Sequence, residues 1–124
     1  MKLPLSLSKG SSLLLLLLAS CATLSASRHV EIARSASART CDAMARCGKV
    51  GAGKAFADLA ACRIDYDAVW SKRWDKATCD QTVNKHGLEQ CLASIDATGC
   101  DSVLDFLNTA LNKCAERRVC SNEE

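Results

Sequence analysis

The cysteines constrain this sequence more than any other feature. The chain has nine of them in 124 residues, and eight lie between positions 41 and 120. An even number of cysteines in an exported chain of this size is typical of a small domain held together by disulfides. The sequence therefore predicts four disulfides among Cys41, Cys47, Cys62, Cys79, Cys91, Cys100, Cys114 and Cys120.

Zinc binding is the main alternative for a cysteine-rich chain. Structural zinc sites use pairs of cysteines separated by about two to four residues. The intervals between successive cysteines here are 5, 14, 16, 11, 8, 13 and 5 residues, so no pair fits. The Cys-x-x-Cys-His pattern of haem attachment is also missing. The sequence predicts neither a metal nor another cofactor.

Residues 1–20 have the pattern of a secretory signal peptide. Lys2 and Lys9 form a basic start, Leu13 to Leu18 form an apolar run, and small residues follow. The apolar run is much shorter than the roughly 20 residues that a membrane-spanning helix needs. We therefore expect export, and no transmembrane helix in the mature chain.

The end of this signal resembles the lipobox of bacterial lipoproteins, at Leu18-Ala19-Ser20-Cys21. The resemblance implies that Cys21 is the first mature residue and carries fatty acids such as palmitate. Two or three acyl chains anchor a protein stably, whereas one does not. The alternative is ordinary signal cleavage after Ala22 or Ala26. Because residue 22 is not Asp, the resemblance also implies the outer membrane rather than the inner one.

The predicted fold class is all-α, with about four short helices cross-linked by the four disulfides. We expect a lipidated tether over 21–29, a disulfide-rich helical domain over 30–120 and a polar tail over 121–124. Apolar residues recur at helical spacing, and no segment alternates as a strand would. The expected helices cover 30–47, 58–74, 83–96 and a last segment that begins at Ser102.

Local signals place the ends and faces of these helices. Gly48 is a typical stop, Asp58 a typical N-cap, and Ser102 to Asp105 resemble a capping box. Cys41 and Cys47 would lie about 9 Å apart along one helix, which is too far for a disulfide between them. All other pairings stay open. The inner stripe of the second helix is expected to contain Leu59, Cys62, Tyr66, Val69 and Trp70.

The segment CGKVGAGKA, residues 47–55, resembles a phosphate-binding loop at first sight. Such a loop needs a Ser or Thr after its Lys and a buried strand before it. Here Ala55 takes the hydroxyl position, and no apolar strand precedes the segment. The sequence therefore predicts a glycine-rich turn and no nucleotide. Without Lys2 and Lys9 the chain has 14 basic and 14 acidic residues, so we also expect no nucleic acid partner.

Tyr66, Trp70 and Trp74 follow one another at a spacing of four residues and so share one side of a helix. The stronger interpretation is an aromatic core, and the weaker one is a ligand or protein platform. Trp74, near the helix end, is expected to be the most exposed of the three. Together with Gly51, Gly53 and Lys54 it forms the predicted interaction surface.

Catalytic residues are hard to assemble from this sequence. His29 is expected in the tether and His86 near a helix start, and all eight cysteines of the domain are committed to disulfides. A Ser-His-Asp group remains a minor alternative, because such groups assemble only in space. We expect no enzyme.

The domain resembles a family of small, cysteine-rich bacterial lipoproteins that is catalogued as a domain of unknown function. The resemblance covers residues 41–120 and depends on Arg46-Cys47-Gly48, Gly51-Ala52-Gly53-Lys54, Phe56, Cys62, a Trp, Leu88 to Ile95, Cys100, Cys114 and Cys120. It implies an exported lipoprotein and no particular activity. Plant lipid-transfer proteins also have eight cysteines, but their Cys-Cys and Cys-x-Cys pairs are missing here, which argues against a lipid tunnel.

The expected function is that of a lipid-anchored, non-catalytic envelope or cell-surface lipoprotein that acts as a protein-interaction or structural module. Its expected partners are the membrane, through the lipid on Cys21, and other envelope proteins. The alternative is a carrier of a small apolar ligand in a pocket between the helices. A sizeable apolar cavity would favour the carrier, and an exposed patch near the glycine-rich turn would favour the interaction module.

Overall fold

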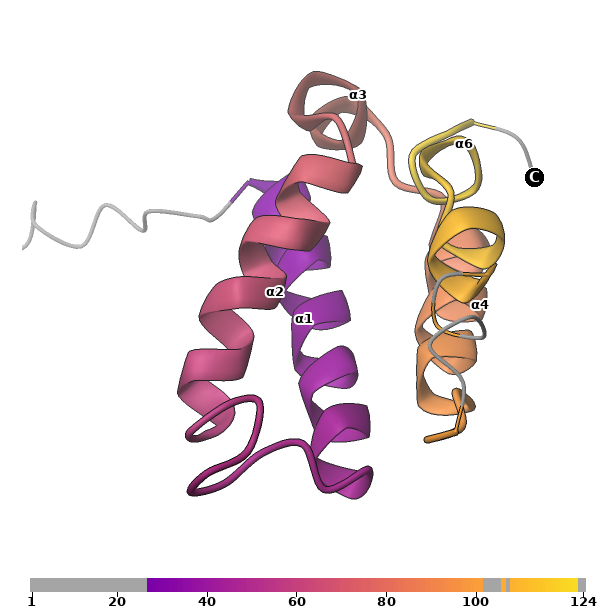
Figure 1. Cartoon of the computed structure of the whole chain (residues 1–124). Coiled ribbons are helices and arrows are strands. Elements are labelled where there is room, and N and C mark those ends of the chain that lie inside the picture. Colours follow the sequence, from indigo (N-terminus) through magenta and orange to yellow (C-terminus); the bar gives the residue numbers. More distant parts are fainter. Residues whose placement is uncertain (1–26, 102–105, 107, 123–124) are drawn as a thin grey trace, which may run out of the picture.

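The computed structural model describes residues 27–101, 106 and 108–122. Helix α1 (Arg28–Arg46) is central, with α2 (Leu59–Arg73) packed along one side of it and α4 (Lys85–Asp96) along the other (Figure 1). The short helix α3 (Lys76–Gln81) connects the two sides. A π-helical segment η1 (Thr109–Lys113) and a short helix α6 (Glu116–Val119) pack against α4. In these ranges no strand is present beyond one isolated bridge, which confirms the all-α class.

Helix α1 begins two residues earlier than expected. Ser27 is its N-cap, and its hydroxyl accepts a hydrogen bond from the Val30 N–H. His29 is buried, because its ring lies against the end of α2. Arg28 and His29 therefore belong to the packed domain, whereas the sequence placed them in the tether. The polar composition of this segment gave no sign that His29 is buried, because its contacts are hydrogen bonds rather than apolar packing.

The C-terminal end of α1 follows the local signal that the sequence carries. The Lys49 N–H donates to the Met44 carbonyl at 2.9 Å, and the Gly48 N–H donates to the Ala45 carbonyl at 3.0 Å. These two bonds form a Schellman motif, which needs a residue with positive φ after the C-cap. Gly48 has φ +68°, so the prediction of a stop at this glycine is confirmed.

Helix α2 begins where expected but buries a narrower stripe than expected. The Asp58 carboxylate accepts a hydrogen bond from the Ala61 N–H at 2.8 Å, which confirms Asp58 as the N-cap. Leu59 and Val69 are 37% and 49% exposed, so their placement on the inner stripe was wrong. Among the described helices, α2 packs chiefly on α1. Because a single helix covers only one side of α2, the covered stripe is limited to Cys62, Tyr66 and Trp70.

Two short elements depart from the prediction of four helices. Helix α3 was missed, because it has six residues and a single buried one, Cys79. The last helix was expected to start at Ser102, but Ser102 to Asp105 lie outside the described residues. The part that follows them is π-helical from Thr109 to Lys113 and gives way to the four-residue α6.

The core is small and contains both tryptophans. The rings of Trp70 and Trp74 lie 4.9 Å apart, and Ile32, Ile95 and Val119 pack in the same cluster. Trp70 is 1% exposed and Trp74 is fully buried. The aromatic-core interpretation of the helix-spaced aromatics is therefore confirmed for these two residues.

Four disulfides join elements that are distant in the sequence, as predicted. None joins Cys41 to Cys47, which also agrees with the helix geometry. Each links two different elements, and the Cα–Cα distances are 5.8 Å for Cys41–Cys62, 5.2 Å for Cys47–Cys100, 4.8 Å for Cys79–Cys120 and 4.7 Å for Cys91–Cys114. Each bridge contributes roughly 2–4 kcal/mol, chiefly by restricting the unfolded chain. Four disulfides indicate an oxidising compartment outside the cytoplasm.

Candidate functional site

The glycine-rich turn connects α1 to α2 and closes on itself. The Gly51 N–H donates to the Phe56 carbonyl at 2.8 Å, and the Phe56 N–H donates to the Lys49 carbonyl at 3.1 Å. The Lys54 N–H donates to the Gly51 carbonyl at 3.0 Å. Gly51 and Gly53 have φ of +136° and +72°, a region in which a side chain is strained. The two glycines are therefore required by the backbone of this turn.

The same hydrogen bonds bear on nucleotide binding. A phosphate-binding loop leaves its backbone N–H groups free to point at the phosphates. Here the N–H groups of Gly51, Lys54 and Phe56 all donate within the turn, and Ala55 has no hydroxyl for a metal ion. The geometry gives no support to a nucleotide site, and its absence stays a prediction.

The predicted interaction surface is not a single patch, because Trp74 is wrongly included in it. Trp74 is the C-cap of α2, at the opposite end of this 15-residue helix from the turn. Its indole N–H donates to the Cys114 carbonyl at 2.9 Å, and its ring packs on Trp70. A residue at a helix end was expected to meet solvent, but the C-terminal segment covers it. Gly53 and Lys54 are exposed at the turn, and Gly51 is partly buried there.

A cavity of about 240 Å³ opens beside the glycine-rich turn. Its wall is formed by the last turns of α1, by Tyr66 of α2, by the segment after α4 and by Phe106. Most of its lining is apolar, and its described members are Thr40, Ala43, Met44, Cys47, Lys49, Tyr66, Thr98, Gly99, Cys100 and Phe106. The sequence carried no direct signal for this cavity, because these residues come together only when Cys47–Cys100 brings the end of α4 to the end of α1.

Tyr66 is the centre of a row of three aromatic rings at this end. Its ring centroid lies 5.9 Å from that of Phe56 and 6.0 Å from that of Phe106, and the Phe106 pair is edge-to-face. Burial raises the pKa of the Tyr66 hydroxyl, and the negative charge of Asp65 adds to this rise. The hydroxyl therefore stays protonated at neutral pH and can act as a hydrogen-bond donor.

Thr40, another cavity residue, is held from two sides. Its hydroxyl donates to the Ala36 carbonyl at 2.8 Å and accepts from the Trp70 indole N–H at 3.0 Å. Thr98 is also committed, because its hydroxyl donates to the Ser94 carbonyl at 3.0 Å. Both hydroxyl protons are used within the protein, so neither residue offers a donor to a ligand.

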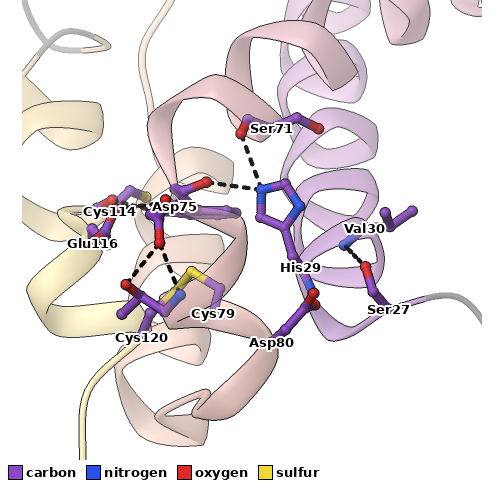
Figure 2. The surroundings of a disulfide bond; sticks show 12 residues. Ser27, His29, Val30, Ser71, Asp75, Cys79, Asp80, Cys114, Glu116 and Cys120 are labelled. Atoms are coloured by element: carbon purple, nitrogen blue, oxygen red, sulfur yellow. Dashed lines mark hydrogen bonds between the residues drawn. A yellow bond between two sulfur atoms is a disulfide. The ribbon is translucent and has the colours of Figure 1, made fainter.

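The opposite end of the domain is built around His29 (Figure 2). Its Nε2 lies 2.8 Å from the Trp74 carbonyl and 3.0 Å from the Ser71 carbonyl, so this nitrogen carries the proton and donates to both. Its backbone N–H donates to the Asp80 carboxylate at 3.0 Å. The ring thus satisfies carbonyl groups that the end of α2 leaves without helical partners. These contacts give His29 a structural role.

Two carboxylates near His29 also hold short elements together (Figure 2). Hydrogen bonds from the Thr78 backbone and hydroxyl lower the pKa of Asp75, the N-cap of α3. A hydrogen bond from Lys76, and then one from the His29 N–H, lower the pKa of Asp80. The Asp75 N–H also donates to the Glu116 carboxylate at 2.7 Å, which joins α3 to α6.

Chemically reactive groups are scattered over the described part of the chain. His86 is exposed, and its Nε2 lies 2.9 Å from the side-chain nitrogen of Gln90 on the same helix. Across residues 27–101, 106 and 108–122, no group of three metal-ligating side chains occurs. The eight cysteines of this part are all in disulfides. Catalytic activity is untested, and its absence stays a prediction.

Comparison with known proteins places the domain in a family. The model of a family of unknown function, DUF6184, matches residues 41–122. The chain belongs to this family. The match starts at the first disulfide cysteine and includes all eight of them, the glycine-rich turn and most of the cavity lining. No curated protein and no solved structure matches the chain.

Membership of DUF6184 confirms the resemblance seen in the sequence, whereas the lipoprotein character stays a prediction. Residues 28–40 of α1, which include His29, and the N-cap Ser27 precede the family match. The signal peptide, the lipidated Cys21 and most of the tether lie outside the described residues. Among the helices that the structure describes, none is long and apolar enough to cross a membrane.

Proposed function

We propose that this member of DUF6184 is a lipid-anchored, non-catalytic envelope lipoprotein whose stapled helical domain acts as a protein-interaction or structural module. Cys21 is its lipid attachment site, and the outer membrane is its location. The lipobox resemblance supports the anchor, and the four disulfides support a compartment outside the cytoplasm. The polar tail beyond residue 120 has no role in this proposal.

One observation carries the proposal: Cys21 precedes α1 in the sequence, whereas the glycine-rich turn follows the other end of this helix. The helix starts seven residues after Cys21, a distance of at most about 25 Å for an extended chain. Its 19 residues then span about 28 Å. The turn follows the end of α1 that is not joined to the tether, so in the anchored protein it can meet partners in the aqueous compartment.

The disulfides support a module that keeps its shape while it is bound. Cys41–Cys62 fixes α2 to α1 near the turn, and Cys47–Cys100 fixes the segment after α4 to the end of α1. A preorganised surface loses less conformational entropy on binding than a mobile one. The exposed groups of this surface are those of the turn, with Lys49 and Lys54 as its charged members.

Two comparisons test this function. Cys21→Ser should move the protein from the outer-membrane fraction to the soluble periplasm, and an unchanged distribution would refute the anchor. A photo-crosslinking residue at position 54 should give discrete protein adducts in cells, whereas one at exposed position 72, at the other end of α2, should not. Equal crosslinking from the two positions would refute the turn as the interaction surface.

A second candidate function is carriage of a small apolar ligand, and the cavity beside the turn favours it. Pockets for drug-sized ligands usually have volumes of about 300–1,000 Å³. The cavity has about 240 Å³, which suits a smaller molecule. Displacement of a bound environment-sensitive dye by such molecules tests this candidate, and a dye that finds no saturable site would refute it.

A further inference from the structure

The cavity beside the glycine-rich turn has a composition that selects among small ligands. Its volume of about 240 Å³ exceeds the 150 Å³ or so of an apolar cavity that holds benzene. It is too small for a ligand of several rings. One ring with a short substituent therefore matches this volume.

The apolar part of the lining suits an aromatic ring. Tyr66 and Phe106 lie edge-to-face, so a third ring can continue the same arrangement. Met44 and the Cys47–Cys100 disulfide add polarisable sulfur atoms, which make favourable contacts with aromatic rings. An aliphatic chain would lose both kinds of contact.

The polar part of the lining suits an acceptor with negative charge. Lys49 is exposed and is the one cationic side chain among the described residues that line the cavity. Within the described residues, no ion pair uses Lys49 and no hydrogen bond uses the Tyr66 hydroxyl. None of the described lining residues is acidic. Since Thr40 and Thr98 donate elsewhere, the uncommitted side-chain donors are those of Lys49 and Tyr66.

We propose that this cavity binds a single-ring aromatic carboxylate, with the ring packed against Tyr66, Phe106 and Met44 and the carboxylate at Lys49. This inference deepens the second candidate function and rests on it. The ligand comes from the aqueous compartment, because the cavity lies at the end of α1 opposite to the tether.

Titration of the full-length oxidised protein with three probes tests the proposal. The probes are benzoate, hexanoate and benzylamine, and the readout is the shift of backbone amide NMR signals. We expect saturable shifts with benzoate at Ala43, Tyr66 and Gly99, with a Kd in the millimolar range for a ligand of about nine non-hydrogen atoms. Hexanoate and benzylamine should each bind at least about tenfold more weakly, because one lacks the ring and the other the negative charge.

Three variants separate the cavity from the charge. Ala43→Leu fills the cavity and should abolish benzoate binding, and its unfolding midpoint shows whether it still folds. Lys49→Gln removes the positive charge at the cavity. Because Lys49 is exposed, this variant does not disturb the core, and it should lower the affinity for benzoate about three- to tenfold. Lys72→Gln removes an exposed charge at the other end of α2, outside the cavity, and should leave the affinity unchanged.

The outcomes distinguish failure of the ligand class from failure of the carrier function. If benzylamine binds as tightly as benzoate, or Lys49→Gln has no effect, the carboxylate assignment is wrong although the cavity binds ligands. If hexanoate equals benzoate, the aromatic assignment is wrong. If no probe gives saturable shifts at the cavity residues, both the ligand class and the second candidate function are refuted.

Discussion

The Nε2 atom of His29 lies 2.8 Å from the carbonyl oxygen of Trp74, and this contact joins the start of α1 to the end of α2. The same nitrogen donates to the Ser71 carbonyl at 3.0 Å. His29, in the first turn of the central helix, therefore holds the beginning of the domain in place.

His29→Ala should lower the free energy of unfolding by about 2–3 kcal/mol, because it leaves two buried or partly buried carbonyl groups without their donor. His29→Gln should recover more than half of that loss, since its amide can donate to both carbonyl groups. Urea unfolding of the oxidised proteins measures both values. Equal destabilisation by the two variants would show that the ring, and not its hydrogen bonds, supports this end.

At Gly87, α4 lies very close to the backbone of α6. A Cβ atom at Gly87 would lie 1.8 Å from the Arg118 carbonyl oxygen, which is backbone and cannot rotate away. Gly87→Ala should therefore separate α4 from α6 and cost about 3 kcal/mol. Gly99→Ala is the matched control, because a Cβ there meets nothing within 4 Å. Similar unfolding midpoints for the two variants would contradict this packing.

Partial reduction should open the disulfides in a definite order. Cys100 is exposed and Cys47 partly buried, whereas the other six cysteines of the domain are at most 4% exposed. A water-soluble phosphine under native conditions should therefore reduce Cys47–Cys100 first. Alkylation and peptide mass mapping identify the thiols that appear. Early label on Cys41 and Cys62 would contradict the described burial.

Acid should weaken the end of the domain around α3. The pKa values of Asp75 and Asp80 are lowered in the folded protein from an ordinary value of 3.8. A lowered pKa stabilises the fold above the ordinary value, and this stability is lost as the pH falls through the folded pKa. We expect the urea concentration at the unfolding midpoint to decrease once the pH falls below about 4.

Asp75→Asn separates this titration from the helix cap. Asn is as good an N-cap as Asp but does not titrate, so the variant should fold at neutral pH and lose less stability in acid. Glu89→Gln, which removes an exposed acid from α4, is the control and should follow the parent protein. An Asp75→Asn profile identical to that of the parent would refute the role of this carboxylate.

The parts of the fold that sequence reasoning captured have local causes. Asp58 and Gly48 mark helix ends through contacts within three or four residues, so their roles could be read directly. A disulfide between Cys41 and Cys47 could be excluded because the distance between two positions on one helix is fixed. The number of disulfides followed from the count of cysteines and their spacing.

The parts that the sequence did not show depend on contacts between distant segments. Trp74 is buried because Cys114 and its neighbours cover the end of α2, and no local pattern reports that cover. The pairing of Cys47 with Cys100 and the cavity beside it also depend on contacts between segments that are distant in the sequence. The N-cap Asp75 was a local signal for helix α3. With six residues, however, this helix is too short to show a periodic pattern of apolar residues.

The intact mass of the protein from a bacterial membrane fraction tests both the lipid anchor and the four-disulfide domain. Free thiols would be alkylated before unfolding and again after it, without reduction. The account predicts a chain that starts at Cys21, carries acyl groups and takes up no label. A mass without acyl groups that starts after Ala22 or Ala26 would contradict the anchor, and label on the cysteines between 41 and 120 would contradict the four-disulfide domain.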